Sequence, residues 1–112
     1  MSETLVTQII REAIGLVADP GTWTEFDLAI TADGASCEPW DVTATRFCAF
    51  GALIKAAYGI SNDRDLAMHF AQAATAAMFG QGGSDPEQLF TINDGEGWEA
   101  VLELFEKTLA RR

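Results

Sequence analysis

Three residues with the chemistry of a cysteine hydrolase follow one another along the chain: Cys48, then His69, then Asn93 or Asp94. One class of cysteine proteases carries its nucleophile, base and orienting group in this order. The nucleophile must be a thiolate, which a helix N-terminus or a neighbouring imidazolium favours. Cys48 is instead predicted to lie in an apolar row inside a helix, where its thiol pKa would rise. We therefore consider a hydrolase that uses Cys48, His69 and Asn93 less well supported than the structural alternative. In that alternative the cysteine packs in the core and the histidine lies on the surface.

Basic residues suggest a second chemistry. Seven Lys and Arg oppose seventeen Asp and Glu, a net charge of −10, yet residues 42–61 contain no carboxylate. Arg46 is expected in the first turns of a buried helix, where a cation must find a partner. We favour an internal partner, such as Asp41 or Asp94. The alternative is an anionic ligand.

The ligand alternative combines cations with stacking faces. Its residues are Arg46, Lys55, Tyr58, Arg64 and Trp98, with Trp40 as a further aromatic. Guanidinium groups bind phosphate and carboxylate in a forked geometry, and they stack on aromatic rings. A small anionic ligand of nucleotide type would suit such a pocket, for instance a signal of host immunity that a phage protein sequesters.

Charge and composition argue against several other classes of protein. A net charge of −10 disfavours direct binding of nucleic acid and of an anionic membrane. Cys37, Cys48 and His69 lack the close pairing of zinc ligands, so we expect neither a metal site nor a cofactor. No apolar run reaches the ~20 residues of a membrane span, and the first residues do not follow the pattern of a signal peptide. The two cysteines are therefore expected to be reduced thiols in a cytoplasm.

Carboxylates recur at helical spacing near the end of the chain. They are Glu96, Glu99, Glu103 and Glu106. A solvated helix face is the default interpretation. The functional alternative is an acidic docking surface for a protein partner, or an inhibitor of a host protein that mimics DNA. Exposed rings at Trp23, Trp40 or Phe79 would indicate a homo-oligomer or a partner interface.

Hydrophobic periodicity predicts a mainly α fold of the α+β class. We expect a compact bundle of about four helices with a small β-hairpin between helices 1 and 2, in a single domain of residues 1–112. The expected elements are helices at 3–18, 42–58, 63–79 and 96–110, a hairpin at 25–38 and a short helical turn at 85–90.

Local signals define these elements. In the hairpin, Phe26, Leu28 and Ile30 alternate with other residues, and Asp33-Gly34 favours a tight turn. Asn93-Asp94 is expected to cap the last helix.

Two steps of the sequence resemble a known pattern. Residues 46–53 read Arg-Phe-Cys-Ala-Phe-Gly-Ala-Leu, and residues 92–94 read Ile-Asn-Asp. They resemble a small uncharacterised bacterial and phage domain family of unknown function, whose pattern is an Arg-aromatic-Cys-x-x-Gly-Ala-Leu helix followed by Trp-Asn-Asp. Ile92 stands where that pattern has Trp. The resemblance covers nearly the whole chain and implies a bacterial or phage cytoplasmic protein without supplying an activity.

These observations favour a non-catalytic binding or regulatory protein. They support a small anionic ligand and a protein partner nearly equally, and a cysteine hydrolase comes third.

Overall fold

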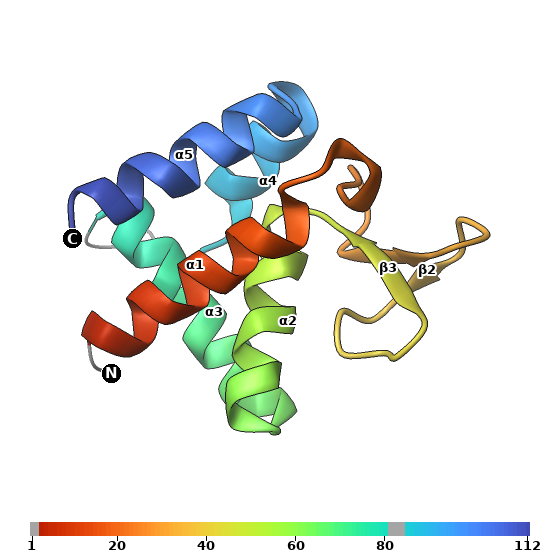
Figure 1. Cartoon of the computed structure of the whole chain (residues 1–112), viewed down its shortest axis with the longest axis horizontal. Helices are drawn as coiled ribbons and strands as arrows, with labels where there is room; N and C mark the ends of the chain where they lie inside the picture. The colour runs from red at the N-terminus through yellow and green to blue at the C-terminus, as the bar shows by residue number, and fades with distance from the viewer. Residues whose placement is uncertain (1–2, 81–84) are drawn as a thin grey trace.

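The computed structural model describes residues 3–80 and 85–112. In this part of the chain a helical body carries a small antiparallel sheet at one end (Figure 1). The elements are α1 (Glu3–Val17), η1 (Pro20–Thr22), β1 (Ala29–Thr31), β2 (Ser36–Cys37), β3 (Ala44–Phe47), α2 (Ala49–Ser61), α3 (Arg64–Phe79), α4 (Glu87–Gly95) and α5 (Trp98–Ala110). The predicted fold class, mainly α with a small β part, is confirmed.

α2 forms the centre of the core. Its buried residues are Ala49, Phe50, Gly51, Ala52, Leu53, Ile54, Ala56 and Ala57. Small side chains dominate this set, so neighbouring helices can approach α2 closely. α1 crosses α2 (Figure 1) and also packs on α3 and α5. The apolar face of α1, which the sequence periodicity predicts, supplies Ile9, Ile10 and Val17 to the core.

The start of α2 differs from the helix predicted at 42–58. Residues 44–47 form β3, which pairs antiparallel with β1. Cys48 is the N-cap of α2, so it does not lie inside the helix. The C-terminal end differs as well, because α2 continues to Ser61 and Asn62 ends it in the left-handed conformation. Residues 44–47 form a strand because β1 lies beside them, a neighbour that local sequence does not reveal.

The sheet has the order β2-β1-β3. β1 and β2 form an antiparallel pair within the predicted hairpin, with Ala29 opposite Cys37. Of the residues in the alternating pattern, Ala29 is buried, whereas Phe26 is 75% exposed. Phe26 lies outside the strands, since β1 begins only at Ala29.

The C-terminal helices are also divided differently. α4 covers nine residues, where a short turn at 85–90 is predicted, and it includes Asn93 and Asp94. α5 begins at Trp98 after Gly97, whose φ of 96° sets the change in direction. Asn93-Asp94 therefore does not cap the last helix.

Candidate functional site

Asn93 is a buried side chain at which three parts of the chain meet. Its Oδ1 accepts hydrogen bonds from Trp23 Nε1 and from Ala49 N, both at 2.8 Å. Its Nδ2 donates to Thr24 O at 3.1 Å and to Asp94 Oδ1 at 2.9 Å. Ala49 is the first residue of α2. Asn93 therefore caps α2 from α4 and fixes the irregular segment at 23–28 against both helices.

Asp94 extends this network to Phe26. Its Oδ1 also accepts the backbone N–H of Phe26 at 2.9 Å. Phe26 has a φ of 71°, a left-handed conformation that costs a residue with a Cβ ~1–2 kcal/mol. Such strain persists where the surrounding structure imposes it, and it is often found at functional sites. The hydrogen bond to Asp94 helps to hold an aromatic residue, 75% exposed, in this conformation.

A cavity of about 190 Å³ lies beside Phe26. It is lined by Phe26, Asp27, Leu28, Cys48, Phe90 and Asp94, and we call it the Phe26 cavity. Phe90 comes from α4 and packs edge-on against Phe50 of α2, with 5.7 Å between the ring centroids. The lining thus combines apolar groups, fixed by the core, with two carboxylates.

A second hollow, of about 560 Å³, shares part of this lining. Its residues include Phe26, Asp27, Leu28, Cys37, Glu38 and Asp41, and we call it the acidic hollow. Desolvation raises the pKa of the Cys37 thiol, and the charges of nearby carboxylates raise it further. These carboxylates are Asp41, Glu38 and Asp27. The Phe26 cavity and the acidic hollow together form one surface, the Phe26 surface, whose described lining contains no Lys or Arg.

Cys48 and Gly51 join α2 to the segment that carries Phe26. Cys48 Sγ accepts a hydrogen bond from Gly51 N at 3.3 Å, and Cys48 N donates to Leu28 O at 3.1 Å. A Cβ placed on Gly51 would lie 1.9 Å from Leu28 O. In this chain the Cys-x-x-Gly step is therefore a helix cap combined with a close backbone contact.

The residues suggested for a hydrolase do not form a catalytic group. Cys48 is only 2% exposed, and this burial raises the pKa of its thiol to about 11. His69 is exposed on α3, with its ring centroid 6.2 Å from that of Phe70. About 20 Å of α2 separates Cys48 from the turn between α2 and α3, whereas His69 lies about 8 Å beyond that turn. The amide of Asn93 is occupied by structural hydrogen bonds, so the geometry does not favour this chemistry.

Part of the suggested anion pocket does come together. The Arg64 guanidinium lies over the Trp40 ring, 5.2 Å from its centroid, and the Trp40 and Tyr58 centroids are 6.3 Å apart. Lys55 lines a different groove, between α1 and α2. Trp98 begins α5, at the opposite end of the molecule from the end of α2 (Figure 1), and its Nε1 donates to Val17 O at 2.7 Å.

Arg46 does not occupy the position that the sequence suggests. It is exposed on β3, opposite Ile30, and not buried in a central helix. Among the described residues, Arg46 has no carboxylate within ion-pair distance. Both proposed internal partners have other roles, because Asp41 accepts from Thr43 N at 2.9 Å and Asp94 accepts from the Phe26 N–H.

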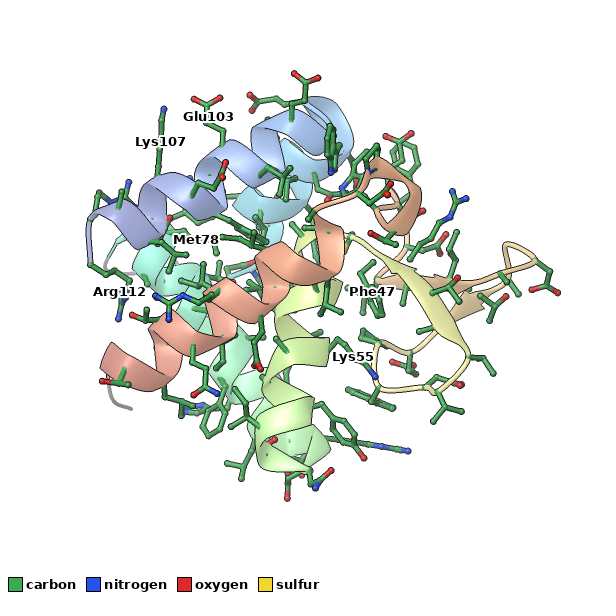
Figure 2. All side chains as sticks on the ribbon, in the orientation of Figure 1. Phe47, Lys55, Met78, Glu103, Lys107 and Arg112 are labelled. Carbon is green, nitrogen blue, oxygen red and sulfur yellow. The ribbon has the colours of Figure 1, made fainter. Side chains whose placement is uncertain are left out.

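The remaining candidates lie on the surface. On α5, Glu103 pairs with Lys107 at 2.9 Å, and both project outward from the helix (Figure 2). Glu99 and Glu106 are also exposed, so this is a solvated acidic face. The rings suggested for an interface, Trp23, Trp40 and Phe79, are only half-buried. Among described residues, the large apolar side chains that are clearly exposed are Phe26, Val42 and Leu66.

The candidate site consists of a buried hydrogen-bond network around Asn93 that holds the segment with the exposed Phe26. The model of DUF6197, a family of unknown function, matches residues 1–111. The chain belongs to this family. The predicted likeness to an uncharacterised domain family is thereby confirmed, and the DUF6197 description assigns no activity. No curated protein and no solved structure matches this DUF6197 chain.

In the part of the chain that the structure describes, no helix is both long and apolar enough to cross a membrane. No cluster of three or more His, Cys, Asp or Glu side chains in this part of the chain is placed to hold a metal ion.

Sequence reasoning misses Phe26 as a site residue, because its alternating pattern places Phe26 in the predicted hairpin at 25–38. One signal does point to this region. Residues 19–48 carry six carboxylates and one arginine, which is half of the net charge in about a quarter of the chain.

Proposed function

We propose that this protein is a non-catalytic binding module and that its Phe26 surface holds a protein partner. One observation carries the proposal. The Phe26 side chain is 75% exposed on a left-handed backbone whose N–H is bound by Asp94. A bulky aromatic residue pays twice in this position, once in backbone strain and once in exposed apolar surface. Contact with a partner would bury the ring.

The hydrogen bonds that hold the segment carrying Phe26 also favour a role in binding. Asn93 connects the 23–28 segment to α2 and α4 through three hydrogen bonds, and a fourth joins it to the neighbouring Asp94. Among the described residues, no buried side-chain polar atom lacks a hydrogen-bond partner. An anchor that is ordered before contact loses little conformational entropy on binding. Aromatic residues beside a cavity also carry a large share of the binding energy at many protein interfaces.

The experiment compares three immobilised baits: wild type, Phe26→Gly and Leu66→Ala. Leu66 is 45% exposed on α3, so Leu66→Ala is a control for removal of another exposed apolar side chain. Proteins retained from lysates of the source cell are quantified by mass spectrometry, and each candidate is then purified and titrated directly against the three variants. We expect a partner that binds wild type and Leu66→Ala alike and Phe26→Gly at least tenfold more weakly. A partner bound equally by all three variants would contradict the proposal.

The proposed setting is a bacterial or phage-infected cytoplasm. Cys37 and Cys48 are free thiols, which supports a reducing compartment. The bacterial or phage source comes only from the sequence resemblance.

A second candidate is a small anionic, planar ligand bound at the stack of Arg64, Trp40 and Tyr58. The cation above the Trp40 ring favours it, because a guanidinium and aromatic faces recognise flat anions. Calorimetric titration with cyclic and ADP-ribose-type nucleotides tests this candidate. We expect binding heat that Arg64→Ala abolishes and that Arg46→Ala, a control at an exposed cation, retains. No heat from any nucleotide would contradict the candidate.

A further inference from the structure

The chemistry of the Phe26 surface defines the kind of partner that it fits. We infer that the partner is a basic peptide segment that inserts one large apolar side chain into the Phe26 cavity and lays Lys or Arg residues over the acidic hollow. This inference rests on the proposed function, because it assigns a partner class to the same surface.

The size of the cavity sets the anchor. Its volume is about 190 Å³, and an apolar protein cavity of ~150 Å³ accommodates a benzene molecule. The Phe26 cavity therefore has room for one aromatic ring or one branched aliphatic side chain. Leu28 and Phe90 provide apolar walls, and the edge-on contact of Phe90 with Phe50 fixes the wall on α4. An anchor placed there would also contact the exposed ring of Phe26.

The charges around the cavity determine which residues of the partner should flank its apolar anchor. Asp27 and Asp94 line the cavity itself, and Glu38 and Asp41 line the hollow beside it. Asp27, Glu38 and Asp41 line the same hollow as Cys37. After desolvation, the charges of these three carboxylates raise the pKa of the Cys37 thiol. Basic residues on each side of an apolar anchor would match this arrangement, and charge complementarity of this kind increases association rates and selects partners.

The same charges disfavour the other occupants of an apolar cavity. A second copy of this chain carries a net charge of −10, so two acidic surfaces would repel each other. Nucleic-acid phosphates and anionic lipid headgroups are repelled for the same reason. A cationic segment is attracted to the carboxylates, and its Lys or Arg side chains can also lie over the exposed Phe26 ring.

A random-peptide display library, panned on the wild-type protein and counter-selected on Phe26→Gly, tests this inference. Selected peptides are then titrated by fluorescence anisotropy at low and at physiological salt. Three proteins are compared: wild type, a variant with Asp27→Asn, Glu38→Gln and Asp41→Asn, and a control with Glu12→Gln, Glu99→Gln and Glu106→Gln. The two triple variants remove the same number of charges, but all three control residues are exposed on α1 and α5.

We expect the selected peptides to carry Lys or Arg around one large apolar residue. Their affinity should fall about tenfold at low salt when the three surface carboxylates are neutralised, and it should stay within about twofold for the control. The salt dependence should shrink with the loss of the carboxylates.

The outcomes separate the two proposals. Peptides that need Phe26 but lack basic residues, and that bind the neutralised variant as well as wild type, would overturn the basic-partner inference and leave the proposed function standing. Wild-type self-association that Phe26→Gly abolishes would also overturn it, because the occupant is then a second copy. A library that yields no ligand dependent on Phe26 would overturn the proposed function, and the inference with it.

Discussion

The side chain of Asn93 caps a helix to which it does not belong. Its Oδ1 accepts the backbone N–H of Ala49, the first residue of α2, at 2.8 Å, while Asn93 itself lies in α4. The first N–H groups of a helix have no partner within it, and Cys48 Sγ satisfies only that of Gly51. The same Asn93 oxygen accepts the indole N–H of Trp23. One amide therefore joins the start of the central helix to the segment that carries Phe26.

Asn93→Ala tests this junction. The substitution leaves two donors, Trp23 Nε1 and Ala49 N, without their acceptor, and an unsatisfied buried donor costs ~1–3 kcal/mol. We expect the free energy of unfolding to fall by about 3 kcal/mol, measured by urea denaturation. Thr91→Ala, at an exposed position of the same helix, should change it by less than about 0.5 kcal/mol. A similar small effect for both variants would show that the Asn93 network adds no stability.

Two glycines of α2 should respond to alanine in opposite directions. A Cβ on Gly51 would lie 1.9 Å from Leu28 O and 2.8 Å from Leu28 C, and backbone atoms cannot rotate away. Gly51→Ala should therefore lower the free energy of unfolding by about 3 kcal/mol. Gly59 has nothing within 4 Å of its Cβ position, so Gly59→Ala should raise it by roughly 0.5–1 kcal/mol through helix propensity. Thermal denaturation of both variants checks the contrast, and equal stabilities would contradict the close contact at Gly51.

The sequence predicts the elements whose signals are local. The apolar spacing of α1 and α5 locates both helices to within two residues at each end, because a helix face repeats every three to four residues. The boundary between β3 and α2 is missed for the opposite reason. Phe47 and Phe50 have helical spacing, but Phe47 belongs to a strand that requires β1 as its neighbour.

The site is harder to predict because its contacts are distant in sequence. Asn93 bonds to Ala49, 44 residues away, and to Trp23, 70 residues away. Its residue type suggests a cap, which is correct in kind, but its position suggests the wrong helix. Phe26 gives no local signal at all, because nothing in its neighbours predicts a left-handed aromatic residue. Its φ follows from tertiary contacts, among them the hydrogen bond to Asp94.

Cys48 should make stability depend on pH above 9. Burial raises the pKa of its thiol from 9.0 to about 11 in the folded protein. The unfolded chain therefore loses this proton first, so the contribution is fully present below pH 9 and is lost as the pH rises toward 11. Between about pH 8 and pH 10.5 the wild type should lose about 2 kcal/mol more than Cys48→Ala. Urea denaturation at both pH values measures the difference, and parallel losses would show that the thiol is not buried.

Cys37 should report on the carboxylates of the acidic hollow. Desolvation and then Asp41, Glu38 and Asp27 raise the pKa of its thiol. Asp41→Asn removes one of these charges, so the fraction of thiolate near pH 8 should increase and alkylation by iodoacetamide should become about twofold faster. Asn keeps an oxygen to accept the Thr43 N–H, which preserves the turn. Glu25→Gln, an exposed carboxylate that is not among the groups acting on Cys37, should leave the rate unchanged. If Asp41→Asn is alkylated at the wild-type rate, the charge of Asp41 does not act on the Cys37 thiol.

Phe26→Gly and Phe26→Ala separate the backbone strain at Phe26 from the role of its ring. Both remove a ring that is 75% exposed and so contributes little to the core, but only alanine keeps a Cβ at the φ of 71°. The glycine variant should exceed the alanine variant in free energy of unfolding by about 1 kcal/mol, because glycine adopts this conformation without steric cost. The free energy of unfolding of the glycine variant should also equal or exceed that of the wild type, although both variants should lose binding to the partner. Chemical denaturation compares the three proteins. If the glycine variant is instead the least stable of the three, Phe26 stabilises the fold, and its exposure does not indicate binding.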